Sequence, residues 1–302
     1  MKILRAADAE GPVILLFGLG LIGGAVDRAL RLRFQAVAQQ TMAYDWHDPA
    51  RRRDQRAAIR AALPDAGRIA LVWAGGSSGF ASSLPEMRQE TALLAELLHM
   101  AQALRRDRRV DVHMLSSAGG LFEGQTHCGR DSRPAPLRPY GQGKLMQEEL
   151  LRRAVGLDRR HVYRPSSVYG ITRSKRVGLV AALIANALQG RMTRIFGNPN
   201  TLRDYVLADD IGQFMARRIM DPDPGPDTGP LLLASGRPAS VFEVIERIHE
   251  RLDRPLMLQF DPHPSNSQDM SFLPSALPTD WRATALGSGI ARIVTILRSG
   301  SA

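Results

Sequence analysis

Residues 12–23 decide the fold of this 302-residue chain, and they read PVILLFGLGLIG. The first half, residues 12–17, is an uninterrupted apolar run, which predicts a buried strand of a parallel sheet. Residues 21–31, which follow the glycines, have the composition of a helix. Gly18, Gly20 and Gly23 therefore stand in a strand-to-helix turn, where a GxGxxG pattern can hold the pyrophosphate of a dinucleotide.

The same turn supplies further candidate contacts for a dinucleotide. Backbone N–H groups at the start of the helix, around Leu21 and Ile22, would receive the negative charge of the pyrophosphate. Ala74 ends a second buried strand at residues 68–74 and is another candidate. A flavin protein would share this motif, and a glycine-rich turn without any ligand is the alternative.

The remaining pattern predicts an α/β fold. Further apolar strands are expected at 110–115 and 161–165, and helices at 83–104 and 140–155. This alternation predicts a Rossmann-type, doubly wound, mostly parallel sheet with helices on both faces. The pattern loosens after Gly170. We therefore expect an NAD(P)-binding domain at residues 1–170 and a smaller C-terminal α/β substrate lobe at 171–302, partly interleaved with the main sheet.

An acidic residue about 20 positions beyond the glycines usually holds the adenosine ribose. That position falls near Gln40, whereas the first acid is Asp45. Asp45 is the candidate ribose acceptor, or else a later acid beside the adenine, and a solvated turn carboxylate is the structural alternative. The run Arg51 to Arg53 lies close enough to bind a 2′-phosphate, so we prefer NAD without excluding NADP.

Composition excludes several other classes of protein. The net charge is +10, but the arginine runs are scattered and no nucleic-acid-binding motif accompanies them, so we expect no nucleic-acid partner. A basic surface would still attract an anionic nucleotide. The single cysteine, Cys128, rules out an intrachain disulfide, and no segment predicts a signal peptide or a membrane span. A cytoplasmic protein without a metal site is expected.

Tyr140 and Lys144 are four residues apart in a predicted helix and therefore share one face. An ordinary tyrosine is a poor base at neutral pH, but a fixed cation and an oxidised nicotinamide both favour the phenolate. Lysine also offers several donors that reach ribose hydroxyls. The chain has only three lysines, so this spacing points to a catalytic pair. A surface tyrosine beside an unrelated lysine is the alternative.

Ser117 follows the strand at 110–115, at the sheet edge where ligands of such folds bind. Its hydroxyl could polarise the reacting oxygen beside the tyrosine. Ser116 is the alternative candidate. For either serine, the structural alternative is that it only caps a turn.

These residues together resemble the extended short-chain dehydrogenase/reductase family, in its NAD-dependent epimerase/dehydratase branch. The resemblance also includes residues 164–170 (RPSSVYG) and residues 203–211 (RDYVLADDI). It implies that Ser117, Tyr140 and Lys144 are catalytic. It further implies that Ser167 and Arg203 contact the substrate, with Arg203 on the nucleotide diphosphate. An Arg203 pair with Asp204 or Asp209 is the structural alternative.

Several departures narrow the expected activity. Phe17 stands at the position of the first glycine in the family's usual loop. Ser167 stands where the family commonly has an asparagine, and Glu90 stands about where another asparagine is frequent. Ser117 is followed by Ala118-Gly119 instead of the Asp-Glu pair that eliminates water in dehydratases.

We therefore expect a homodimeric NAD-dependent epimerase that transiently oxidises a ring hydroxyl of a nucleotide-diphosphate sugar, with Tyr140 as base. The alternatives are an NAD(P)-dependent nucleotide-sugar reductase or dehydrogenase, and a non-catalytic dinucleotide-binding assembly subunit.

Overall fold

The computed structural model describes residues 1–8, 11–64, 66–76, 78–105, 108–172, 178–221, 223, 229–262 and 267–299. The chain divides into two compact units. The first comprises Met1–Ser116, Arg138–Tyr163 and Gly212–Leu231, and the second comprises Ser117–Leu137, Arg164–Ile211 and Leu232–Ala302. The functional division at residue 170 stays a prediction.

A seven-stranded sheet has the order β10-β6-β5-β4-β2-β1-β3. Its strands are β1 (Lys2–Arg5), β2 (Val13–Phe17), β3 (Val37–Thr41), β4 (Arg68–Trp73), β5 (Arg109–Leu115), β6 (Arg159–Pro165) and β10 (Leu231–Leu233). The pairs β2–β4, β4–β5 and β5–β6 are parallel, which confirms the predicted parallel sheet. Strand β1 is antiparallel to both of its neighbours, β2 and β3.

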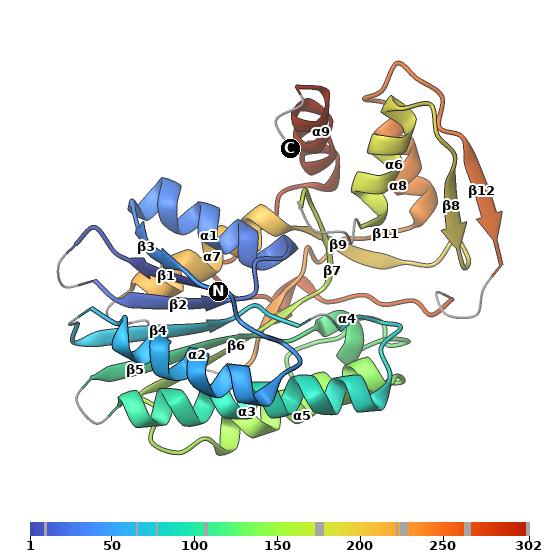
Figure 1. The fold of residues 1–302 in the computed structure, drawn as a ribbon. Helices are drawn as coiled ribbons and strands as arrows, with labels where there is room; N and C mark the ends of the chain where they lie inside the picture. The colour runs from blue at the N-terminus through green and yellow to red at the C-terminus, as the bar shows by residue number, and fades with distance from the viewer. Residues whose placement is uncertain are drawn as a thin grey trace. The chain divides into compact units, whose positions relative to one another are not determined.

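Helices cover both faces of this sheet (Figure 1). Helices α2 (Pro49–Ala61), α3 (Leu84–Leu104) and α5 (Pro139–Arg153) lie on one face, and α1 (Leu21–Phe34) and α7 (Ala208–Met220) lie on the other. Every residue of β2 and β4 is buried, which explains why both strands read as continuous apolar runs. A capping box formed by Ser83 and Glu86 starts α3.

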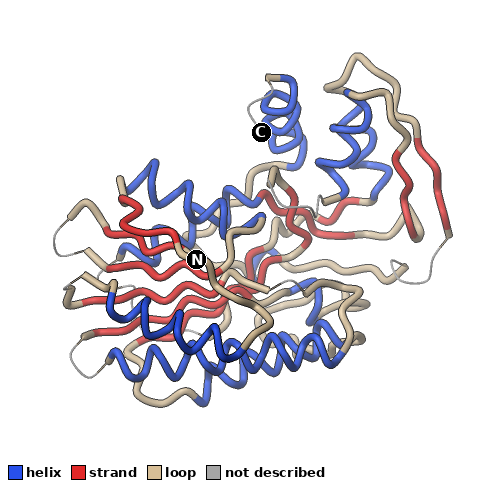
Figure 2. Tube along the Cα trace, in the orientation of Figure 1, coloured by secondary structure: helices blue, strands red, loops and turns tan. Residues whose placement is uncertain are grey.

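The second unit contains two smaller sheets. One has the order β11-β9-β7, and the other pairs β8 with β12 in parallel. The elements are α4 (Ala118–Leu121), β7 (Ser167–Tyr169), α6 (Leu179–Leu188), β8 (Thr193–Phe196), β9 (Arg203–Leu207), β11 (Pro238–Ala239), α8 (Val241–His249), β12 (Leu258–Asp261) and α9 (Leu286–Arg298). Helices α6, α8 and α9 share an apolar core with β7 and β9. Figure 2 shows this mixture of helix and strand.

Strand β1 is the main feature that the sequence pattern did not predict. It lies between β2 and β3 in the sheet, so the strand that follows α1 is one position farther from the glycine loop than in the ordinary arrangement. Lys2 on β1 donates to Asp27 of α1 at 2.7 Å, which ties the added strand to the first helix. None of the described helices is long and apolar enough to cross a bilayer.

Candidate active site

The glycine loop between β2 and α1 has the geometry that its motif predicts. Gly18 adopts a φ of +91°, and a Cβ atom there would lie 2.4 Å from the carbonyl oxygen of Ala74. A Cβ on Gly23 would lie 1.9 Å from the carbonyl oxygen of Gly18, so only glycine permits this close packing of helix and loop. By contrast, nothing lies within 4 Å of the Cβ position of Gly20.

The loop therefore has a tightly packed side and an open side. The amide of Ala74 donates to the carbonyl oxygen of Phe17 at 2.8 Å, which holds the ends of β2 and β4 together behind the loop. Gly20 precedes Leu21, the first residue of α1, and no side chain caps this helix. Its first N–H groups are thus available to an anion, and the open face at Gly20 fits the pyrophosphate of NAD.

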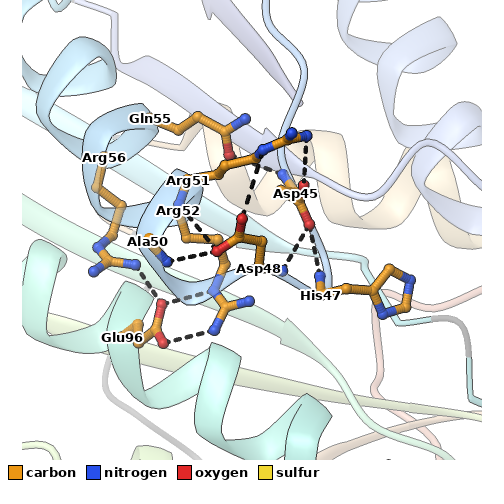
Figure 3. A network of polar contacts seen from close by, with 9 residues as sticks. All are labelled: Asp45, His47, Asp48, Ala50, Arg51, Arg52, Gln55, Arg56 and Glu96. Atoms are coloured by element: carbon orange, nitrogen blue, oxygen red, sulfur yellow. Dashed lines mark hydrogen bonds and ion pairs between the residues drawn. The ribbon is translucent and has the colours of Figure 1, made fainter.

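Asp45 lies in the turn between β3 and α2 (Figure 3). Its Oδ1 accepts hydrogen bonds from the amides of His47 and Asp48, both at 2.8 Å, and these hold the pKa of Asp45 below its usual value. Its Oδ2 lies 3.7 Å from a guanidinium nitrogen of Arg51. The carboxylate therefore organises the start of α2 through one oxygen. Its predicted bond to the adenosine ribose would use the other.

Trp46, which the sequence did not single out, lies beside the glycine loop. A Cβ on Gly75 would lie 2.4 Å from the Trp46 ring. A Cβ on Gly18 would in turn lie 2.4 Å from the Cα of Gly75. The ring centroid lies 5.7 Å from that of the buried Trp73. An aromatic surface next to a nucleotide loop is suited to packing against a base. The motif gave no signal for Trp46, because it specifies only the glycines and an acidic residue.

Tyr140 and Lys144 lie one turn apart near the start of α5, and the Lys144 ammonium is 5.8 Å from the centre of the Tyr140 ring. The half-buried tyrosine also packs against Phe80, with ring centroids 5.5 Å apart. The small Gly143 between them has a structural purpose. A Cβ there would lie 2.4 Å from the side chain of Met87, so glycine lets α3 and α5 approach closely.

Lys144 is buried in a cluster with Glu90 and Gln147. Its Nζ donates to Oε1 of Glu90 at 2.9 Å and to Oε1 of Gln147 at 3.1 Å. The amide of Gln147 donates to the same Glu90 oxygen at 3.0 Å. The exposed fractions are 5% for Lys144, 7% for Glu90 and 0% for Gln147. The sequence marked Glu90 only as a departure from the family. The i, i+3 spacing of Lys144 and Gln147 was the available signal for the rest.

Both charges in this cluster persist at neutral pH. Burial alone would raise the pKa of Glu90, but the Lys144 ammonium and the Gln147 amide outweigh burial and hold that pKa below its usual value. Burial would likewise lower the pKa of Lys144, but the Glu90 carboxylate outweighs it and the lysine pKa is raised. The cluster is therefore an ion pair with little net charge.

The two serines after β5 have different partners. Ser116 belongs to the first unit, and its hydroxyl donates to Oε1 of Glu148 on α5 at 2.5 Å. Ser117 belongs to the second unit, where its hydroxyl accepts from the amide of Gly120 at 3.0 Å and caps the short helix α4. Capping is the structural alternative that the sequence offered for Ser117. The catalytic role of Ser117 stays a prediction.

The candidate substrate residues Ser167 and Arg203 share one sheet. Ser167 on β7 pairs with Tyr205 on β9, two residues beyond Arg203, so the side chains of Ser167 and Arg203 lie on the same face. The buried Asp204 points to the other face. It accepts from the amides of Ser235 at 2.6 Å and Gly236 at 2.8 Å. Burial raises the pKa of Asp204.

Comparison with known proteins gives a consistent result. A sequence model of the NAD dependent epimerase/dehydratase family matches residues 25–233 and begins just after the glycine loop. The UDP-glucose 4-epimerase of Mycolicibacterium smegmatis is 35% identical over 129 residues, which cover 40% of this chain and 39% of that protein.

Two solved structures have the same fold. MoeE5, in complex with UDP-glucose and NAD, matches with a TM-score of 0.77 at 18% identity and covers 96% of this chain and 99% of its own. The UDP-glucose 4-epimerase of Thermus thermophilus, in complex with NAD, matches with a TM-score of 0.75 at 18% identity. That match covers 94% of this chain and 98% of the epimerase.

Proposed function

This chain belongs to the NAD dependent epimerase/dehydratase family, and from that premise we propose that it is an NAD-dependent epimerase of a nucleotide-diphosphate sugar. The observation that carries the proposal is the pairing of Tyr140 and Lys144 on one face of α5, in the same unit as a glycine loop that fits a pyrophosphate. UDP-sugars are the first substrates to test, because the related epimerases are named for UDP-glucose.

Each residue has a defined task in the proposed reaction. The loop from Gly18 to Gly23 binds the pyrophosphate of NAD with backbone N–H groups, and bound NAD supplies reversible hydride transfer. Tyr140 takes the proton from a ring hydroxyl of the sugar and later returns it. Lys144 holds positive charge beneath Tyr140 and is the candidate partner of the nicotinamide ribose.

The proposal assigns the substrate to the second unit. Arg203 offers a planar guanidinium to the nucleotide diphosphate, and Ser167 on the same sheet face offers a hydroxyl to the sugar. Ser117 polarises the reacting oxygen. The Ala118-Gly119 pair after Ser117 provides neither an acid nor a base, so water elimination is not part of the proposal.

The decisive experiment incubates the purified protein with UDP-glucose or UDP-glucuronic acid, without added cofactor, and follows the sugar by proton NMR. An epimerase converts one sugar into its epimer with no net change in NADH absorbance. A stoichiometric change in that absorbance when NAD(P) or NAD(P)H is added identifies a dehydrogenase or reductase. Cofactor binding without turnover of any nucleotide-sugar identifies a non-catalytic subunit.

We also propose that the protein is a cytoplasmic homodimer that pairs through α3 and α5. Leu145 and Met146 on α5 are exposed apolar side chains with exposed fractions of 37% and 43%, and a dimer interface would cover them. Light scattering should give a molar mass twice that of one chain, and Met146→Glu should lower this mass to that of a single chain.

A further inference from the structure

The cluster around Lys144 has a feature that the proposed reaction does not require. The ammonium that favours the Tyr140 phenolate is bonded to a buried carboxylate, Glu90, from a different helix. The second oxygen of this carboxylate, Oε2, accepts from the amide of Ser78 at 3.3 Å. A Cβ on Gly76 would lie 2.4 Å from that same oxygen. Glu90 therefore joins α3, α5 and the loop after β4.

The effect of Glu90 on Tyr140 follows from the signs of the charges. A positive charge near a phenol favours its ionised form, and a negative charge nearby opposes it. Lys144 and Glu90 are in contact, so the negative field of Glu90 offsets part of the positive field of Lys144 at Tyr140. Burial of both groups keeps solvent from screening either charge.

We propose that Glu90 is a positioning residue of the proposed epimerase reaction: it fixes the Lys144 ammonium beneath Tyr140 and offsets the charge by which that ammonium favours the phenolate. The catalytic part of this inference rests on the proposed function. The electrostatic effect itself involves only Glu90, Lys144 and Tyr140 of one unit, and it can be measured without substrate or cofactor.

Other charged groups near the pair do not reverse this balance. Among the described residues, Lys144 also faces the Glu148 carboxylate from its own helix, which adds negative charge. Glu148 is hydrogen-bonded to Ser116. Arg138, two residues before Tyr140, has its guanidinium 5.7 Å from the centroid of the Phe80 ring, which itself packs against Tyr140. Glu90 is thus the direct partner of Lys144 in the cluster.

The chain is well suited to a direct test by tyrosine absorbance. It has five tyrosines. Tyr140 is half-buried, whereas the other four are buried, and burial raises the pKa of three of them: Tyr44, Tyr169 and Tyr205. The hydroxyl of the fourth, Tyr163, is 2.9 Å from Nδ1 of His113. Tyr140→Phe should remove one phase of an alkaline titration, and that phase, termed the first phase, is the one that the test follows.

The test compares Glu90→Gln with the wild-type protein in this titration. Glutamine keeps the shape and one acceptor oxygen, replaces the other oxygen with an NH2 donor, and removes the negative charge. The first phase should move to lower pH by about half a unit to one unit, because a single nearby charge shifts a titration by this order. Glu90→Asp, which retains the charge, should titrate like the wild type. Glu149→Gln is the matched control, since it removes the same charge from the exposed face of α5.

A second readout uses the pH profile of kcat/KM for sugar epimerisation. Its acidic limb should move to lower pH in Glu90→Gln by the same amount, with the limb unchanged in Glu149→Gln. Loss of structure alone would lower activity at every pH without moving the limb. If Glu90→Gln does not fold, Glu90→Asn provides a smaller neutral side chain for the same comparison.

The outcomes separate the two proposals. A first phase in Glu90→Gln that overlays the wild type or moves to higher pH overturns the role of Glu90, whether or not the protein turns over a sugar. A downward shift in a protein that binds NAD but converts no nucleotide-sugar supports the electrostatic role and overturns the epimerase function.

Discussion

The glycine loop and the tyrosine–lysine pair belong to the same unit but are held in place in different ways. The loop is fixed by backbone contacts between the ends of two neighbouring strands, such as the 2.8 Å bond from Ala74 to Phe17. Lys144 is fixed by Glu90, which is 54 positions away in the sequence. A local motif can specify the first arrangement, whereas the second depends on a partner that the motif does not contain.

The largest expected effect comes from Tyr140, the reacting group of the pair. Tyr140→Phe should lower kcat of sugar epimerisation about 10²–10⁴-fold, because it removes the acid–base group and little else. Affinity for NAD, measured by calorimetry, should change little, since the loop is untouched. An activity within a few-fold of the wild type would show that Tyr140 is not the base.

A second prediction concerns the dependence of the pair on its distant partner. Lys144→Met leaves the Glu90 carboxylate buried without its cation, and the free energy of unfolding should fall by about 3–5 kcal/mol. The double variant Lys144→Met/Glu90→Gln should recover most of this loss, because it removes both charges. Urea unfolding at neutral pH measures the difference. Equal instability of the single and double variants would show that the ion pair is not what stabilises this position.

The glycine loop should respond to substitution according to its two sides. Gly23→Ala places a Cβ 1.9 Å from a backbone oxygen, and this overpacking should destabilise the protein by about 1–3 kcal/mol. Gly20→Ala points into open space, so the melting temperature of the free protein should barely change.

Affinity for NAD provides the contrast between these two glycines. The added methyl of Gly20→Ala should weaken NAD binding at least ~10-fold, because it occupies the space through which the backbone approaches the pyrophosphate. Calorimetric titration with NAD measures this loss. Undiminished affinity in Gly20→Ala would show that the open face of the loop is not the pyrophosphate site.

The ion pair also predicts how stability depends on pH. Because the folded pKa of Glu90 lies below its unfolded value of 4.5, its contribution is complete above 4.5 and is lost as the pH falls through the folded value. Lys144 behaves in the opposite sense. Its folded pKa is raised above 10.5, so its contribution is present below 10.5 and is lost as the pH rises through the raised value.

Glu90→Gln removes the acidic part of this dependence. Its free energy of unfolding should therefore fall less than that of the wild type between neutral pH and acid. Chemical unfolding at a series of pH values measures this difference. Parallel curves for the two proteins would assign the acid sensitivity to other carboxylates.

The sequence predicted the parts of the fold that depend on local pattern. The strands β2, β4, β5 and β6 are confirmed, because apolar runs are visible in short stretches, and β2, β4 and nearly all of β5 are buried on both faces. Strand β1 was missed. Its four residues lack a distinctive pattern, and its place between β2 and β3 is decided by pairing with residues far along the chain.

The same distinction holds within the candidate site. The three glycines and the Tyr140–Lys144 spacing were identified from sequence, since each is a short-range pattern. The capture of Lys144 by Glu90 and the position of Trp46 beside Gly75 were not, because both require the packing of separate elements. The position of β3, one strand farther from the loop than the motif assumes, is likewise a long-range feature that the local spacing does not contain.

Asp45 gives the smallest and most discriminating prediction. Its Oδ1 is already occupied by two backbone amides, so only Oδ2, near Arg51, can accept from the adenosine ribose. Asp45→Asn should therefore weaken NAD binding only about 5-fold, or ~1 kcal/mol, because one charged hydrogen bond becomes a neutral one. Asp48→Asn is the matched control, since it alters the cap of α2 without changing Asp45.

Affinity for NADP decides between the two interpretations of this turn. A carboxylate near the ribose repels a 2′-phosphate, so Asp45→Asn should bind NADP more tightly than the wild type while it binds NAD less tightly, with Arg51 free to pair with the phosphate. Calorimetry with both dinucleotides measures the two changes. If neither affinity changes, Asp45 only organises the turn. In that case another residue recognises the ribose, and that residue, like Glu90 beside Lys144, is one that the local motif does not contain.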